Sequence, residues 1–354
     1  MTILSRLLLS SPGADTQPGP RTTELLSINE EQFKDLLALA HSNHVIVRGL
    51  EVFRGIMADA QDNVRAAWAA TAVAVEHTRI TKAIGWLRVI CDAFDEEGLD
   101  VTVMKSLDHW PDLGSDLDLY TNSSSKAVCD MMQRRFDAQI APQSWGDRLA
   151  CKWNFVIPGL SEAVEVHTGR LGQTGEQLVL AARLPVRSRR VEIEGQWFRV
   201  PSASDRLMIS TLQRMYRHFY FRLCDMVDSA ALAASGEIDY DDLRSSAQAA
   251  GIWEGVATYL VIVSDYRGRY SGTDLELPKF VTDTARFRGD LVYFSRDFLR
   301  IPIMPQSAGL YLSQLGGLLR RRELHSSARL GLLPWLASAA AVGQKITGTD
   351  KGIW

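Results

Sequence analysis

Apolar residues recur every three to four positions through most of the first hundred residues, which is the spacing of helices that bury one face. In the segment 28–44, a Leu-rich stripe follows two acidic residues, as helix N-termini prefer. A second stretch, rich in Ala, Val, Arg and Glu, predicts one long helix from Phe53 to Phe94, with Gly98 just past its end. We therefore expect an N-terminal helical region at residues 23–98.

From residue 99 the pattern changes to short β-branched segments, several of which alternate between apolar and polar residues. Gly159 and Gly195 lie between pairs of such segments, where they predict hairpin connections. Strands are predicted at residues 101–105, 116–121, 151–158, 162–168 and 189–201, and one helix at 124–136.

Helical spacing returns at residue 202. The expected fold class is therefore α+β, with a small mixed β-sheet core at residues 99–201 between the N-terminal helical region and a C-terminal helical domain at 202–354. Residues 1–22 are expected to form a flexible tail, because the short apolar run Leu7–Leu9 is followed by a segment rich in Pro and Gly. That run is also shorter than the roughly 7–15 residues of a signal-peptide core.

The composition is that of a soluble globular protein, not of a disordered chain, a collagen or a disulfide scaffold. Of 354 residues, 46% are hydrophobic and 23% are charged. The 39 Lys and Arg oppose 42 Asp and Glu, so the net charge of −3 lacks the basic excess of a dedicated nucleic-acid binder. The four cysteines form no Cys-x-x-Cys pair, and the longest apolar stretch, Ala66–Val75, is shorter than the roughly 20 residues of a membrane span. We therefore expect a cytoplasmic protein with reduced cysteines and no membrane partner.

Two aspartates in the second predicted strand are the main candidates for chemistry. Side chains of a strand alternate between its faces, so Asp116 and Asp118 share one face while Leu117 and Leu119 share the other. Two carboxylates this close repel each other unless a cation lies between them. Carboxylate oxygens suit Mg²⁺ (or Mn²⁺), which completes its coordination shell with waters and substrate phosphates.

A third acid occurs in the segment 162–168, where Glu165 and His167 alternate with two valines. If this strand lies beside the strand 116–121, Glu165 joins the two aspartates. Three carboxylates on neighbouring strands can hold two divalent ions for a phosphoryl displacement.

These motifs together resemble the DNA-polymerase-β-like nucleotidyltransferase superfamily, and in particular an uncharacterised bacterial nucleotidyltransferase family with the layout LKG, SDxDL and vExH. The matching segments are MKS at 104–106, SDLDL at 115–119 and VEVH at 164–167, with helical-half features at 204–207, His218 and 225–228. The resemblance covers about residues 80–265. Ser106 departs from the family, which has Gly at this position.

The resemblance implies an enzyme that moves a nucleoside monophosphate from a nucleoside triphosphate, ATP first among them, to an acceptor hydroxyl and releases pyrophosphate. It places the catalytic core at residues 99–201. Asp116, Asp118 and Glu165 would bind the metal ions, and Glu165 would also act on the acceptor hydroxyl. Phosphate contacts would come from Lys105, Ser106, Gly114 and Ser115, and acceptor or supporting contacts from His167, His218, Arg222 and Asp225. The last three residues are spaced to share one face of a helix.

Two other functions stay open, and so does the acceptor, which can be a small molecule, a protein or a tRNA. One alternative is a non-catalytic binding module, antitoxin-like in character, which the Lys105-Ser106 departure favours. The other is a metal-dependent glycosyltransferase that uses the Asp-x-Asp pair, although its fold would require alternating strands and helices before that pair.

Overall fold

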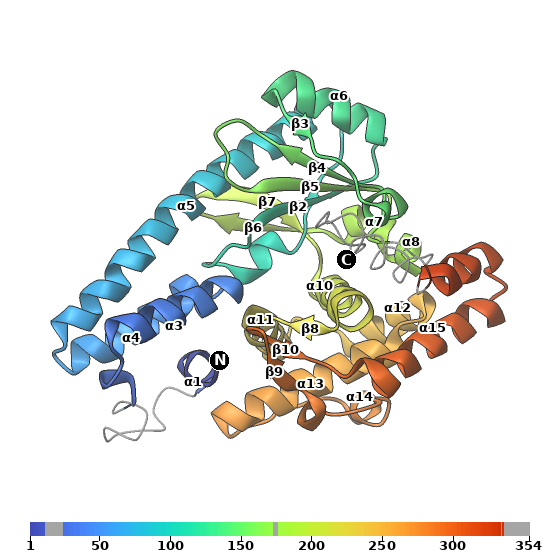
Figure 1. Ribbon diagram of the computed structural model, residues 1–354. Helices are drawn as coiled ribbons and strands as arrows, with labels where there is room; N and C mark the ends of the chain where they lie inside the picture. Colours follow the sequence, from blue (N-terminus) through green and yellow to red (C-terminus); the bar gives the residue numbers. More distant parts are fainter. Residues whose placement is uncertain (11–23, 173–175, 334, 336–354) are drawn as a thin grey trace.

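The computed structural model describes residues 1–10, 24–172, 176–333 and 335. The fold class is α+β, as predicted: a five-stranded mixed sheet lies among helices, with strand order β1-β2-β5-β4-β3 (Figure 1). Its strands are β1 Thr102–Val103, β2 Asp116–Thr121, β3 Gln139–Ile140, β4 Lys152–Val156 and β5 Ala163–Thr168.

The strands β2 and β5 lie side by side and run parallel, whereas the other neighbours in the sheet are antiparallel. Their register sets Asp118 opposite Glu165. The predicted alternation is confirmed, because Leu117 and Val164 are fully buried in the core between the sheet, the helix α5 (Asn63–Glu96) and the helix α6 (Ser125–Phe136). The acidic side chains therefore project from the opposite face of the sheet.

The N-terminal helices end where their sequences change. The helices are α1 Thr2–Leu9, α3 Glu30–Ser42, α4 Ile46–Asp59 and α5 Asn63–Glu96. The single helix predicted from Phe53 to Phe94 is wrong: it is divided between α4 and α5, because Gln61 takes a left-handed backbone (φ 56°) and the Asp62 side chain caps α5 by accepting a hydrogen bond from the Arg65 amide. The end at Gly98 is confirmed, with φ 68°.

The expectation of a flexible tail is wrong for residues 2–9, which form helix α1. Leu4 and Leu7 are buried against the helical core, and the Ser5 hydroxyl lies 2.7 Å from the Tyr266 hydroxyl of a distant helix. The leucine run is thus the apolar face of an amphipathic helix. The remainder of the expected tail, from residue 11, lies outside the described residues.

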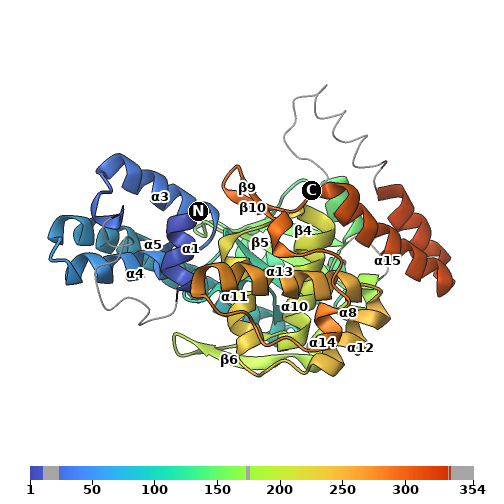
Figure 2. The same cartoon turned by 90° about the horizontal axis from the view of Figure 1, so that it is seen from below.

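The N-terminal and C-terminal helices share one hydrophobic core. Leu50, Phe53 and Val73 pack in the same cluster as residues of the C-terminal helices, such as Leu260. Helix α5 continues from this cluster to the sheet, where Phe94 packs beneath the strands. Seen from below, α1 lies directly beside the C-terminal helices α11 (Leu223–Ala234) and α13 (Trp253–Ser271) (Figure 2). The domain boundaries expected after residues 22, 98 and 201 stay predictions.

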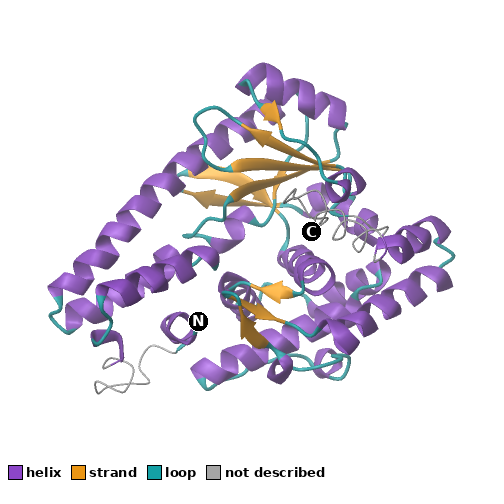
Figure 3. Ribbon diagram, in the orientation of Figure 1, coloured by secondary structure: helices purple, strands orange, loops and turns teal. Residues whose placement is uncertain are grey.

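The C-terminal region is helical with one small sheet of order β8-β10-β9, which Figure 3 shows in orange among the helices. Its elements are α10 Ala203–Thr211, the π-helical turn η2 Leu212–His218, β8 Tyr220–Phe221, α11 Leu223–Ala234, α12 Tyr240–Ala250, α13 Trp253–Ser271, α14 Lys279–Thr282, η3 Gly289–Leu291, β9 Tyr293–Ser295, β10 Phe298–Arg300, η4 Ile303–Ser307 and α15 Ala308–Arg320. The remaining elements are η1 Ser106–His109, α7 Trp145–Leu149, α8 Glu176–Ala181, α9 Leu184–Arg187, β6 Arg189–Ile193 and β7 Gln196–Val200.

The β6–β7 and β4–β5 hairpins are confirmed, with register pairs Ile193↔Gln196 and Phe155↔Val164. Among the described helices, none combines the length and the apolar character needed to cross a lipid bilayer.

The shared helix face predicted for His218, Arg222 and Asp225 is wrong. The helical path ends at His218, because Phe219 takes a left-handed backbone (φ 58°) and the next residues form β8, which pairs with β10. Arg222 and Asp225 belong instead to the beginning of α11.

Candidate functional site

Acidic side chains of β2 and β5 form the floor of a cleft between the sheet and the C-terminal helices. Asp118, Glu165 and His167 each offer one ligand atom, and these atoms lie within 4.8 Å of one another. Asp116 lies two residues before Asp118 at the exposed start of β2. The parallel register therefore brings together the three predicted carboxylates and the predicted histidine.

Two lysines neutralise most of the charge of this acidic floor. The Lys105 Nζ lies 2.5 Å from Asp118 Oδ1 and 3.8 Å from Glu165 Oε1. The Lys152 Nζ lies 2.7 Å from Glu165 Oε2 and 3.0 Å from an Asp147 carboxylate oxygen. The His167 Nε2 lies 2.9 Å from Glu165 Oε1, so Glu165 has contacts on both oxygens.

The two central carboxyl groups have different proton affinities. Burial raises the pKa of Asp118 to about 7, against the opposing effect of Lys105. Burial also disfavours ionisation of Glu165, but Lys105, His167 and Lys152 together hold its pKa well below its usual range. In the absence of metal, Glu165 is therefore ionised at neutral pH, whereas Asp118 is partly protonated.

This difference predicts a pH dependence of stability that belongs to Asp118. Between its ordinary pKa of 3.8 and about 7, only the folded protein binds the proton, so the free energy of unfolding falls as pH rises through this window. The slope from one such proton is at most about 1.4 kcal/mol per pH unit. Asp118→Asn mimics the protonated form and should lose this slope. Urea denaturation without divalent metal, from about pH 4.5 to pH 7, measures it; equal slopes in the variant and the unaltered protein would contradict the prediction.

The turn between β1 and η1 has a strained backbone. Lys105 adopts φ 53°, a conformation that residues other than glycine rarely take. The Ser106 hydroxyl donates a hydrogen bond to the Asp116 carbonyl (3.2 Å) and accepts one from the Asp118 amide (2.8 Å). Ser106 is buried, and its hydroxyl holds the turn against β2. The turn thus directs the Lys105 ammonium at the carboxylates, and the predicted phosphate contact of Ser106 has to compete with these bonds.

The predicted phosphate residues Gly114 and Ser115 lie at the rim of the same cleft. A Cβ atom on Gly114 would come within 3.2 Å of the His44 ring, so the absence of a side chain allows the loop to pack there. The Ser115 hydroxyl lies 3.3 Å from Asp116 Oδ2.

A basic wall faces the acidic floor across the cleft. Arg217, His218 and Arg222 line it, together with Arg214 and the two lysines of the floor, and the cleft has about 800 Å³ of empty volume, part of it open to solvent. The Nε atoms of Arg217 and Arg222 are buried, and within the described part of the chain they have no hydrogen-bond partner.

The predicted supporting residues divide into two groups. Burial, together with Arg217 and Arg214, holds the pKa of His218 well below 6.5, so its imidazole is neutral in the cleft. Asp225 is buried outside the cleft lining: it lies 2.8 Å from the Arg214 Nε and accepts a hydrogen bond from the Arg222 amide (2.6 Å). Asp225 therefore positions the basic wall, whereas His218 and Arg222 face the cleft.

The cleft residues that were not predicted from the sequence include Lys152 and the arginines at 214 and 217. Lys152 had a readable signal, because it is a charged residue in an apolar strand, the same reason that singled out Glu165. The arginines had none, since the irregular η2 turn that aims them depends on contacts with distant segments.

No family model matches this chain, and no curated protein sequence matches it. Among solved structures, the chain is similar to an antigenic nucleotidyltransferase-like protein from Paracoccidioides brasiliensis, with 13% sequence identity and a TM-score of 0.32. That similarity covers 48% of this chain and 86% of the other chain.

Proposed function

We propose that this chain is a Mg²⁺-dependent nucleotidyltransferase that transfers a nucleoside monophosphate from a nucleoside triphosphate to an acceptor hydroxyl. The observation that carries the proposal is one cleft in which carboxylates from two adjacent parallel strands face a wall of arginines. Such a cleft suits an anionic ligand that is bound through cations, as a nucleoside triphosphate is bound through its metal ions.

The donor set fits a hard divalent ion. Asp116, Asp118 and Glu165 offer carboxylate oxygens, which Mg²⁺ and Mn²⁺ prefer. The Lys105 ammonium between Asp118 and Glu165 supports this fit, because it shows that a cation is already favoured at that position. When bound, Mg²⁺ would neutralise phosphate charge and make the acceptor hydroxyl more acidic.

The residues of the basic wall are arranged to bind phosphates. Arg217 and Arg222 form no ion pair within the described residues, so their guanidinium groups are available for bidentate contacts with phosphate oxygens. Arg214 is held by Asp225 and fixes the wall in place. Glu165, ionised and 2.9 Å from the His167 Nε2, would hold the metal ion that makes the acceptor hydroxyl more acidic.

We expect α-labelled nucleoside triphosphate, with Mg²⁺ and cell extract as acceptor, to transfer its label, ATP being the first choice. Each of the four triphosphates is tested, with the same extract lacking the protein as the control. With γ-labelled nucleotide, adding the protein must not increase the transfer of label. Label found on a small molecule, a protein or RNA identifies the acceptor class. No transfer of α-label from any triphosphate, together with intact nucleotide binding, would contradict the proposal.

One observation favours a second function, the non-catalytic binding module. The Lys105 ammonium lies beside Asp118 and Glu165, two residues that would hold a metal ion, and if it stays there the cleft would bind anions without turnover. In that case the triphosphate binds equally well with and without Mg²⁺. The fold gives the glycosyltransferase no support, because β1 is the one described strand before β2.

A further inference from the structure

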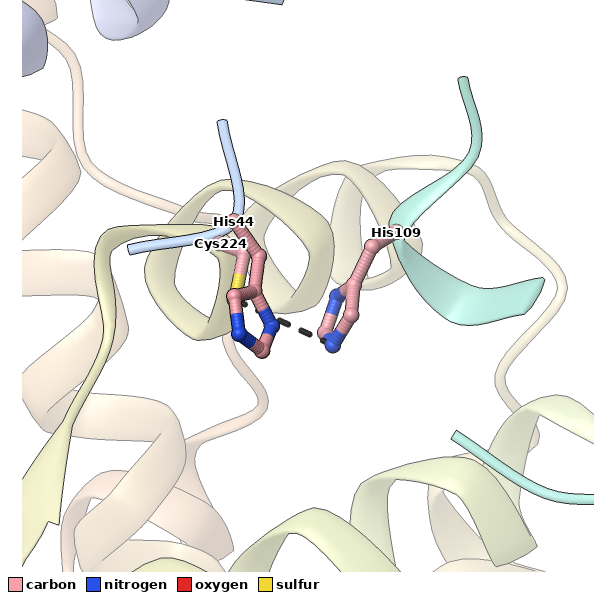
Figure 4. Close-up of side chains that lie close together, drawn as sticks. All are labelled: His44, His109 and Cys224. Atoms are coloured by element: carbon pink, nitrogen blue, oxygen red, sulfur yellow. Dashed lines mark hydrogen bonds between the residues drawn. The ribbon is translucent and has the colours of Figure 1, made fainter. Parts of the chain in front are cut away.

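Two histidines and a cysteine from three separate segments lie close together (Figure 4). His44 lies in the loop between α3 and α4, His109 ends η1, and Cys224 lies in the first turn of α11. Each offers one ligand atom, and these atoms lie within 4.8 Å of one another. The Cys224 Sγ is 3.8 Å from the His109 Nε2.

The two ring nitrogens of His109 have different surroundings. Its Nδ1 lies 2.5 Å from an Asp228 carboxylate oxygen, which leaves Nε2 directed at Cys224. Asp228 is held in turn by Arg48, which also binds the buried Asp112. A carboxylate that fixes the second nitrogen of a histidine is the usual support of a metal-binding imidazole.

The loop that carries His44 is fastened to the helix that carries Cys224. The fully buried Asn43 accepts a hydrogen bond on its side-chain oxygen from the Leu223 amide (2.8 Å) and one on its carbonyl from the Cys224 amide (3.3 Å). These bonds hold His44 in a left-handed backbone with φ 52°. A strained backbone of this kind persists only where the surrounding structure imposes it, and here it brings the imidazole to the cysteine.

One ring nitrogen of the cluster makes no hydrogen bond among the described residues, and a ligand can reach the cluster from the cleft. The His44 Nδ1 is buried and, among the described residues, has no hydrogen-bond partner, which is costly unless a ligand compensates for it. His44 and His109 both line the cleft, and His44 also lines a neighbouring cavity that Glu76 and Arg79 border. An ion can therefore reach the cluster from the cleft.

We propose that His44, His109 and Cys224 bind Zn²⁺ at a site separate from the carboxylates. Imidazole and thiolate are the ligands that zinc prefers, and bond lengths of about 2.0 and 2.3 Å at a tetrahedral ion place nitrogen and sulfur roughly 3.6 Å apart. The observed 3.8 Å needs little adjustment. Binding releases to solvent the thiol proton of Cys224 and the Nε2 proton that His109 carries in its imidazolium form. Three protein ligands leave the fourth position for water or for a group in the cleft.

Zinc at this position would influence the nucleotide cleft through the backbone segments that carry its ligands. His109 ends the turn that begins at Ser106, directly after Lys105. The ion would tie this turn to α3–α4 on one side and to α11 on the other. Zinc binding therefore fixes Lys105 relative to the arginines of the basic wall, because Arg222 directly precedes α11.

The test uses the full chain after removal of metal with a chelator. Co²⁺, which replaces zinc and reports its ligands, is expected to give a thiolate-to-cobalt charge-transfer band at one ion per chain, and Zn²⁺ is expected to abolish it and to raise the melting temperature. Cys224→Ser should lose the band and weaken zinc binding at least about 10-fold. His44→Asn should also weaken binding, while asparagine tolerates the left-handed backbone, so the loop is preserved.

Two control variants establish that the cobalt band belongs to this cluster. Cys91→Ser removes a buried cysteine elsewhere, and Asp118→Asn alters the carboxylate floor; both should bind Co²⁺ with the same band as the unaltered protein. Circular dichroism establishes that each variant is folded. The proposal is overturned if the unaltered protein gives no charge-transfer band, or if folded Cys224→Ser and His44→Asn both bind Zn²⁺ as tightly as the unaltered chain.

Discussion

Asp118→Asn is expected to lower the rate of Mg²⁺-dependent nucleotidyl transfer by about 10³-fold or more while the protein stays folded. The substitution removes a carboxylate from the centre of the acidic floor, where a bound metal ion would contribute several kcal/mol to the stabilisation of the transferring phosphate. Asparagine keeps the size of the side chain, so the packing of β2 against β5 is preserved. Single-turnover transfer of α-label, measured with saturating nucleotide, gives the rate directly.

Asp130→Asn is the matched control for this prediction, because Asp130 is an exposed carboxylate on α6, paired with Lys126. Its transfer rate should equal that of the unaltered protein. If Asp118→Asn retains its transfer rate, the carboxylate floor does not carry the chemistry. If neither protein transfers label but both bind triphosphate, the cleft is a binding site without turnover.

Asp112→Ala should lower the free energy of unfolding by about 3–5 kcal/mol, the usual loss when one partner of a buried ion pair is removed. Asp112 is 1% exposed. It accepts hydrogen bonds from the Val47 amide (2.6 Å) and from the Arg48 Nε (2.7 Å). The substitution leaves that amide without its acceptor and Arg48 with the Asp228 carboxylate alone. Urea-induced unfolding, followed by circular dichroism, measures the loss.

The exposed Lys126–Asp130 pair again provides the comparison, since surface ion pairs contribute little to stability. Asp130→Ala should leave the free energy of unfolding nearly unchanged. A loss below about 1 kcal/mol for Asp112→Ala would mean that α4 is held against the loop before β2 by apolar packing, without help from this carboxylate.

Local patterns determined the acidic half of the cleft. The alternation of Asp116 and Asp118 with two leucines fixes which face of β2 is polar, whatever the rest of the chain does. The same period sets Glu165 and His167 apart from the valines of β5. Helix ends were equally readable where capping is local, as at Gly98, because only neighbouring residues take part.

The sequence pattern gave wrong helix predictions where a helix depends on distant contacts, or where it ends at a residue without a clear conformational preference. The division between α4 and α5 depends on a left-handed Gln61, a residue with no special preference for that conformation. Helix α1 reads as a tail because its eight residues are stable only when its leucines pack against C-terminal helices.

The sequence by itself therefore determined which carboxylates share a face of their strand, since periodicity is a property of each strand alone. Only the tertiary structure decided what faces them. The strand β8 redirects the chain after His218 because it pairs with β10, which lies much later in the chain, and this turns Arg222 into the cleft. The meeting of His44, His109 and Cys224 likewise depends on packing between segments far apart in the chain. Contacts of that range follow from the burial of a common core, which no window of neighbouring residues encodes.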